Sequence, residues 1–310
     1  MEKLTYFFID DVIWTFRDIA REKPASLFDN GFMKMLKENH DKYGLTVQLN
    51  LFYATDVYYG NDFFNLSEMP DIYKDEFQSN KDWLRLAFHA RQEFPDYPYV
   101  NATYEDVYAD YNLIKNEVLR FAGEGMFSDV LCTHWLPLSK EAVRALCDCG
   151  IRIVTPTVGD RREYEGDMSV LPYGHAARLL HNRQPETMLY TRTRNDPRLL
   201  SSICAYNHIS AKQKAQGDNK NISFKDENFN IFYREVCCGI CLNLLTVEQI
   251  KERITTLAEK NVEYIGTATH EQYYYPDYFA YQSNTKEKFD VMCKELYNSG
   301  YRFVTADELK

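Results

Sequence analysis

Acidic and imidazole side chains follow two apolar segments at opposite ends of the chain. The segment 4–9 is apolar or aromatic and leads into Asp10–Asp11, and the segment 264–269 leads into His270–Glu271. Short apolar runs that end in polar turns are typical of buried strands. Carboxylates and an imidazole gathered in one place can transfer protons or ligate a divalent cation. The two pairs therefore predict one shared site.

The elements that must position these pairs alternate along the chain. Short apolar segments predict strands, and amphipathic segments between them predict helices, as in βα units that feed a largely parallel sheet. The predicted strands are Leu4–Ile9, Thr46–Tyr53, Leu84–His89, Asp129–Thr133, Arg152–Thr155, Asn230–Val236, Tyr264–Thr269 and Arg302–Thr305. In a (β/α) barrel the carboxyl ends of the strands face one rim, where active sites are built. We therefore expect an α/β fold of the barrel class.

Length and composition favour a single domain. The chain has 310 residues, of which 45% are hydrophobic, and this is enough to fill one barrel core over residues 1–310. The rhythm of strands and helices breaks at about 156–225, where stretches rich in Arg, Asp and Asn interrupt strand-like pieces. We interpret this region as an inserted hairpin or subdomain beside the site.

Charge and hydropathy restrict the class of partner. The formal net charge is −10 and the lysines and arginines do not cluster, which argues against nucleic acid or an anionic membrane as a partner. No apolar stretch is long enough to span a bilayer, and the first residues do not have the pattern of a signal peptide. We therefore expect a soluble, cytoplasmic protein, and leave a homo-oligomer open.

Two segments in the first third of the chain resemble motifs of the polysaccharide deacetylases, the family with the NodB homology domain. The strand Phe7–Asp11, which ends in two aspartates, is similar to the first motif of that family, although Val12 replaces the usual glycine. The segment His89–Glu93 is similar to the second motif, which has two histidines four residues apart. Here Glu93 replaces the second histidine.

Two later segments follow in the order of the same family. Thr133–Pro137 and the helix after it lie where the third motif is expected, but the arginine of that motif is missing. Ile265–His270 and the stretch Gly300–Leu309 are similar to the last histidine motif and the final strand. The resemblance therefore covers nearly the whole chain outside the region 156–225.

The resemblance implies a fold, a cofactor and a reaction. It implies a distorted (β/α) barrel that holds one divalent metal ion, either zinc or cobalt, nickel or manganese. By the same resemblance, Asp10 is the general base, His270 is the general acid, and Asp11 and His89 are metal ligands. The implied reaction is hydrolysis that removes an acyl group from an N-acylated sugar or a related small amide.

The third metal ligand has two candidates. Glu93 would supply an oxygen where the family has an imidazole nitrogen, and this would favour harder ions. His134 ends the fourth predicted strand, so a set of Asp11, His89 and His134 is also open, with Glu93 orienting one of the histidines. The sequence alone leaves both candidates in place.

Aromatic residues near the same strand ends suggest how a substrate would be held. Ring faces stack on the apolar faces of pyranoses, and the polar edges of Tyr and Trp can bond sugar hydroxyls. The candidate substrate-binding residues are Trp135, Tyr274, Tyr275 and Glu271. A carbohydrate or another small acylated substrate is therefore the expected partner.

Two other functions remain open. A metal-independent glycoside hydrolase would use one acid and one base or nucleophile at a set separation, and the available carboxylates are Asp10, Asp11, Glu93 and Glu271. A barrel that binds carbohydrate without catalysis is suggested by the missing arginine and the altered second motif. Structural roles are open as well, because Asp10–Asp11 could cap the following helix and a single histidine could lie bonded in the core.

Overall fold

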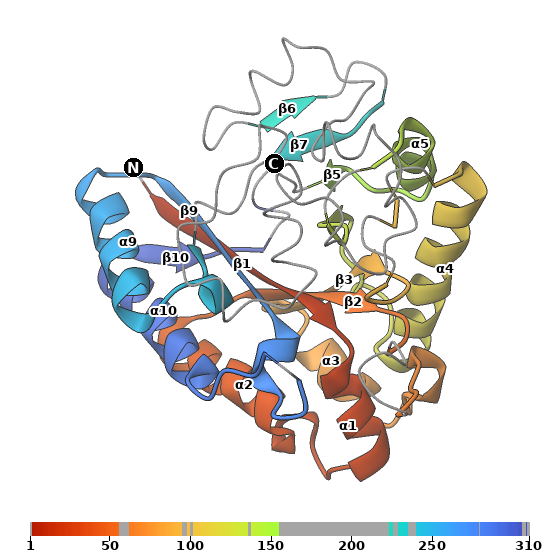
Figure 1. Ribbon diagram of the computed structural model, residues 1–310, viewed down its shortest axis with the longest axis horizontal. Coiled ribbons are helices and arrows are strands. Elements are labelled where there is room, and N and C mark those ends of the chain that lie inside the picture. Colours follow the sequence, from red (N-terminus) through yellow and green to blue (C-terminus); the bar gives the residue numbers. More distant parts are fainter. Residues whose placement is uncertain are drawn as a thin grey trace.

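The described part of the chain folds into two largely parallel sheets with helices packed around them (Figure 1). The computed structural model describes residues 2–55, 62–94, 98–99, 102–135, 138–154, 223–225, 229–234, 240–278, 280–305 and 308. The predicted α/β class is therefore confirmed. The predicted insertion at 156–225 lies outside the described residues except for 223–225.

The larger sheet is built around the first strand. Its order is β3 (Leu84–Ala90), β2 (Val47–Phe52), β1 (Lys3–Val12), β9 (Tyr264–His270) and β8 (Ile240–Cys241), and β10 (Tyr301–Phe303) pairs with the start of β1. All of these pairings are parallel. The four long strands lie within one or two residues of their predicted positions, apart from the extension of β1 to Val12.

The smaller sheet contains short strands. Its order is β4 (Val130–Leu131), β5 (Ile153–Val154), β7 (Phe232–Arg234) and β6 (Ser223–Lys225). Strand β6 runs antiparallel to β7. The predictions Asp129–Thr133 and Arg152–Thr155 were too long, because only two residues of each segment pair in the described structure. Backbone bonds between β3 and the segment around β4, including His134 N to the His89 carbonyl oxygen at 3.3 Å, join the two sheets.

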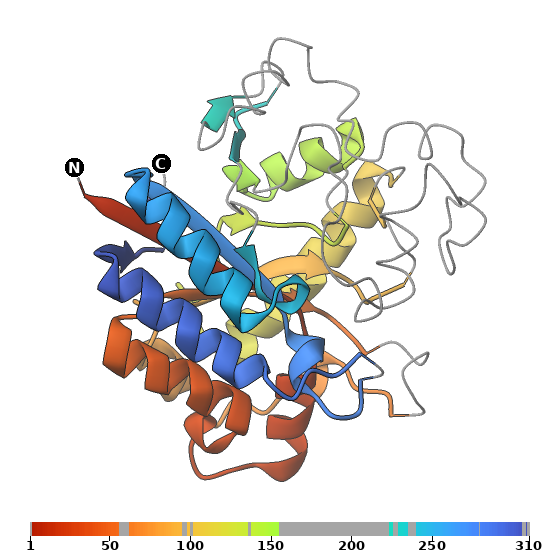
Figure 2. The same cartoon turned by 60° about the vertical axis from the view of Figure 1, so that its left-hand side comes forward.

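Helices cover the outer faces of these sheets. They are α1 (Trp14–Glu22), α2 (Gly31–Tyr43), α3 (Lys74–Ser79), α4 (Tyr104–Phe121), α5 (Lys140–Asp148), α9 (Val247–Glu259) and α10 (Thr285–Asn298). Short 3-10 turns lie at η1 (Leu27–Asp29), η3 (Leu66–Glu68), η6 (Leu242–Leu244) and η7 (Glu271–Tyr274). Figure 2 shows α9, α10 and α2 side by side along one face of the larger sheet. In the described part of the chain, no helix has the length and apolar character that a bilayer crossing requires.

Alternation along β1 separates two hydrophobic clusters. Phe7 and Ile9 belong to the large cluster that includes residues of α1, α2 and α10, whereas Tyr6 and Phe8 belong to a smaller cluster with Val130 of β4. Because side chains of a strand alternate between its faces, the residue that follows Tyr6 and Phe8 on the inner face is Asp10. The fold therefore directs a carboxylate between the two sheets at the carboxyl end of β1.

Candidate metal centre

The ends of β1 and β9 bring the two sequence pairs together. Parallel pairing runs from Leu4 opposite Tyr264 to Asp10 opposite His270, so these last two residues are neighbours in the sheet. Beyond this point Asp11 adopts a φ of 61°, and the register of β1 against β2 shifts between Ile9 and Val12. This irregularity lets two consecutive residues serve one site, because a regular strand would send Asp11 to the opposite face.

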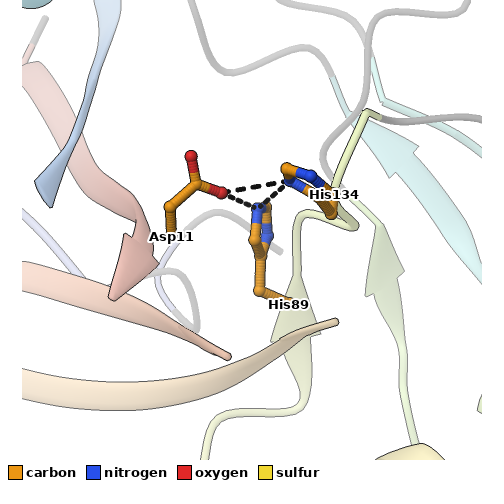
Figure 3. A group of neighbouring side chains, drawn as sticks. All are labelled: Asp11, His89 and His134. Atoms are coloured by element: carbon orange, nitrogen blue, oxygen red, sulfur yellow. Dashed lines mark hydrogen bonds and ion pairs between the residues drawn. The ribbon is translucent and has the colours of Figure 1, made fainter. Parts of the chain in front are cut away.

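Asp11, His89 and His134 form a compact group of potential metal ligands (Figure 3). Asp11 Oδ1 lies 3.0 Å from His89 Nε2 and 3.1 Å from His134 Nδ1, and the two ring nitrogens are 3.3 Å apart. Ligand atoms at tetrahedral positions around zinc, each about 2.0–2.1 Å from the ion, are roughly 3.3 Å apart. The observed spacing therefore fits three corners of a divalent-metal site.

The far nitrogens of both rings are fixed by backbone carbonyl groups. His89 Nδ1 lies against the Cys132 carbonyl oxygen, and His134 Nε2 lies 2.9 Å from the Glu93 carbonyl oxygen. A carbonyl oxygen only accepts, so each far nitrogen carries the proton. The nitrogens that face Asp11 are then lone-pair acceptors beside a carboxylate oxygen. Three acceptors at these distances require a proton or a cation among them, and the group therefore fits a bound metal ion.

Electrostatics support a charged Asp11. Burial opposes ionisation of Asp11, but His134 and His89 hold the pKa of its carboxyl well below its usual value. Burial also lowers the pKa of His134, whereas at His89 the carboxylates of Asp10 and Asp11 outweigh burial and raise the pKa. The second carboxylate oxygen of Asp11 is buried without a hydrogen bond. The side chain thus retains an acceptor for a cation or for a substrate.

Asp10 occupies a different environment from Asp11. Burial raises the pKa of Asp10, against the opposing effect of His89 and His270. Asn50 Nδ2 donates to Asp10 Oδ1 at 2.7 Å, and Gln48 Nε2 in turn donates to Asn50 Oδ1 at 2.8 Å. A neutral amide thus orients this carboxylate. Two adjacent carboxyl groups with pKa values shifted in opposite directions suit different tasks, one as a proton acceptor and one as a ligand.

His270 is held at the rim by a second amide. Its Nδ1 lies 3.0 Å from Asn243 Oδ1, and its Nε2 lies 4.0 Å from Asp11 Oδ2. The amide oxygen accepts, so Nδ1 of His270 carries a proton and Nε2 faces the ligand group. His270 is 21% exposed at its side chain, whereas Asp11 is fully buried. The ring therefore lies between the ligand group and solvent.

Of the two candidates for the third ligand, the structure brings His134 into the group. Glu93 is buried, but its carboxylate oxygen Oε2 accepts a hydrogen bond from Gln272 Nε2, and its Oε1 is 3.9 Å from the protonated side of His134. Glu93 contacts the centre through its backbone carbonyl, which orients the His134 ring. The Asp11, His89 and His134 set is the one group of this kind found among the described residues.

The predicted substrate-binding residues lie in two places. The ring of Trp135 is 5.8 Å from that of His134, so this side chain lies at the centre. The structure places Tyr274 and Tyr275 against Phe32, and Tyr275 also packs on Trp14. Glu271 is buried with both carboxylate oxygens bonded to backbone groups at the start of α1. These three residues thus join the rim to its supporting helices.

Three polar residues of the site were not predicted from the sequence. Asn50 orients Asp10, Asn243 orients His270, and Gln272 holds Glu93. A signal for Asn50 was present, because Gln48 and Asn50 alternate with apolar residues in a buried strand and so mark its inner face. Asn243 and Gln272 lie in short turns, where the sequence pattern gives no such periodicity.

Comparison with known proteins finds likeness in structure only. No protein-family model matches the sequence, and no curated protein matches it. A 4-alpha-glucanotransferase from Thermococcus litoralis matches with a TM-score of 0.56 and 11% identity over 100% of this chain and 40% of that chain. A family 4 acetyl xylan esterase from Clostridium thermocellum, in complex with a cobalt ion, matches with a TM-score of 0.42 and 10% identity over 99% and 90% of the two chains. The chitin deacetylase from Colletotrichum lindemuthianum matches with a TM-score of 0.45 and 10% identity over 100% of this chain and 88% of that chain.

These likenesses concern the fold. The chain spans 40% of the length of the glucanotransferase that it matches. Its structural neighbours also include the acetyl xylan esterase and the chitin deacetylase.

Proposed function

We propose that this protein is a metal-dependent hydrolase that removes an acyl group from an N-acylated sugar or a related small amide. The observation that carries the proposal is the convergence of three lone-pair acceptors, from Asp11, His89 and His134, on one point near the carboxyl ends of β1 and β3. Asp10 and His270 flank that point on neighbouring strands. Ligands with an acid and a base beside them are the minimum that metal-assisted amide hydrolysis needs.

Each residue has a distinct task in this proposal. Asp11 through a carboxylate oxygen, His89 through Nε2 and His134 through Nδ1 would hold a divalent cation, which when bound polarises a carbonyl and acidifies a coordinated water. Asp10, oriented by Asn50, accepts the proton of the attacking water. His270, oriented by Asn243 and partly exposed, donates a proton to the departing amine through Nε2. Trp135, whose ring contacts that of His134, is the aromatic residue that we propose to contact the sugar.

The paired-carboxylate alternative is weakened by the contacts of its candidate residues. Both oxygens of Glu271 are bonded to the backbone at residues 13–15, and Asp11 faces two histidines. A glycoside hydrolase would therefore have to rely on Asp10 and Glu93 alone. A binding barrel without catalysis remains the alternative outcome of the experiment below.

The test combines metal content with turnover. The purified protein is expected to bind about one zinc, cobalt, nickel or manganese ion per chain and to release acetate from N-acetylated sugar oligomers in the metal-loaded form. Asp10→Asn should keep the metal and lose turnover by about 100-fold or more, because general-base catalysis contributes typically 10²–10⁴-fold. Asp290→Asn on α10 is the matched control and should retain both, because the Asp290 carboxylate also accepts from an asparagine amide, Asn39 Nδ2 at 2.8 Å. Binding of metal and sugar without turnover in the wild type would contradict the hydrolase and favour the binding barrel.

A further inference from the structure

Glu271 caps a helix that starts on a distant part of the chain. Its Oε2 accepts from the backbone N–H groups of Ile13 and Trp14 at 2.7 and 2.8 Å, and its Oε1 accepts from that of Thr15 at 2.9 Å. The side chain is fully buried. The first N–H groups of a helix have no partner within it, and Ile13 at the N-cap position has no polar side chain to supply one. Glu271, at the start of η7, therefore supplies the acceptors that the start of α1 lacks.

The position of this contact links it to the metal centre. Asp10 opposite His270 is the last pair of the β1–β9 ladder, and the pairing of the two strands ends there. The carboxylate of Glu271 joins the two segments again, one residue after the end of β9 and three to five residues after Asp10. Asp11 lies inside this closed loop of backbone and side-chain contacts. Any shift of α1 against η7 would therefore move the Asp11 carboxylate relative to His270.

The backbone of Asp11 needs such support. Its φ of 61° lies in the left-handed region, which residues with a side chain adopt only where neighbouring structure enforces it. Upstream, the β1–β9 ladder holds the chain as far as Asp10. Downstream, Val12 pairs with Leu51 of β2. Residues 13–15 are then held by Glu271 and by the bond between Thr15 Oγ1 and the Tyr275 hydroxyl at 2.7 Å, and both of these contacts come from the segment that follows His270.

We propose that Glu271 is a positioning residue that holds the Asp11 turn in the conformation that binds the cation. The proposal deepens the function proposed above and rests on it, because the cation site is the same. Glu271 reaches the centre through the backbone of residues 11–15, and both of its carboxylate oxygens are occupied by that backbone. Its role thus differs from the substrate contact expected from the sequence.

The test variant is Glu271→Gln in the full chain, with Asn30→Ala as the matched control. Glutamine has nearly the same shape but places an NH₂ group against backbone N–H donors. Zinc and cobalt affinities are measured by isothermal titration well below the melting temperatures of both variants. The affinity of Glu271→Gln is expected to fall by about 10- to 100-fold, the range found when groups that orient metal ligands are removed. Asn30→Ala also removes a buried helix cap, at α2, and should lower the melting temperature while keeping the wild-type affinity.

A second readout does not depend on metal. Amide hydrogen exchange of residues 12–15 in the metal-free protein should accelerate in Glu271→Gln and stay unchanged in Asn30→Ala. If Glu271→Gln does not fold, Tyr275→Phe, which removes only the hydroxyl bonded to Thr15, should show the same two effects at a smaller size. Wild-type affinity and exchange in the folded variant would overturn the proposal. If the wild type binds no cation, the proposed function fails, and the proposed positioning of Asp11 for a cation fails with it. Accelerated exchange of residues 12–15 in Glu271→Gln would in that case still establish the helix-capping contact.

Discussion

Replacement of His134 by alanine tests the ligand set most directly. His134 provides one of three ligand atoms, and its Nδ1 lies 3.1 Å from Asp11 Oδ1 and 3.3 Å from His89 Nε2. Binding of zinc to four-ligand structural sites contributes about 10–16 kcal/mol, so one ligand accounts for roughly 3 kcal/mol. A loss of about 3 kcal/mol corresponds to about a 100-fold weaker Kd. We therefore expect His134→Ala to weaken zinc binding by about two orders of magnitude.

The design of this experiment must separate ligation from packing. The His134 ring packs edge-on against Phe52 with ring centroids 5.0 Å apart, so alanine also leaves a cavity. His134→Phe fills that space but cannot ligate, and it should lose as much affinity as alanine. His40→Ala is the matched control, because His40 is also bonded to a backbone carbonyl, that of Leu45, but lies on α2 and stacks on Trp83.

The choice between the two candidate ligands decides how the outcome is interpreted. Glu93→Gln keeps the backbone carbonyl that orients His134, so its affinity should stay within about threefold of the wild type. Competition with a chelator of known affinity gives Kd for each variant, and the melting temperature without metal shows that each is folded. A wild-type Kd in His134→Ala, or an equal loss in Glu93→Gln and His134→Ala, would refute the assignment of His134 as the third ligand.

Three further predictions concern protons and stability. Asn50→Ala leaves the buried Asp10 carboxylate without its amide donor and should lower the free energy of unfolding by about 1–3 kcal/mol in urea titrations, with metal stoichiometry retained. Burial raises the pKa of Glu271 from 4.5 to about 7, so the folded state binds more protons than the unfolded state between these pH values. The free energy of unfolding should therefore fall by about 3 kcal/mol as the pH rises from 4.5 to 7. In urea titrations at several pH values, Glu271→Gln should lack this part of the slope, and an identical pH profile would contradict it. The pKa of His89 is raised in the metal-free protein, so zinc binding near neutral pH should release protons. Calorimetric titrations in several buffers should then give binding enthalpies that depend on the ionisation enthalpy of the buffer. Enthalpies that are the same in all buffers would argue against His89 as a ligand.

The sequence was sufficient for the long strands and for the polar residues at their ends. Buried parallel strands are rich in apolar and β-branched residues, so β1, β2, β3 and β9 stand out as segments of six or more residues in which these types predominate, despite polar interruptions such as Gln48 and Asn50 in β2. Strand direction then places Asp10–Asp11 and His270 at one edge without any knowledge of distances. The short strands of the second sheet were predicted too long, because two paired residues leave almost no periodicity to detect.

The ligand set was decided by tertiary structure. Residues four apart face each other only on a helix, but the chain after His89 leaves β3 into a bend, so the spacing of His89 and Glu93 does not bring their side chains to one point. His134 reaches the site from the turn that follows β4, and its backbone N–H donates to the His89 carbonyl oxygen, a contact that no local sequence pattern predicts. The choice between Glu93 and His134 therefore depended on contacts distant in sequence.

The sequence by itself determined that a carboxylate pair and an imidazole end two buried strands, since apolar runs and strand alternation are local properties. Only the tertiary structure decided which carboxylates serve which task. Asp10 and Asp11 are adjacent in the chain, yet a positive φ and different neighbours give them opposite pKa shifts. Glu271 follows His270 directly, yet its oxygens are bonded to a helix start some 257 residues away. Bonds that join distant parts of a chain form only after packing, and this is why composition and spacing could not assign them.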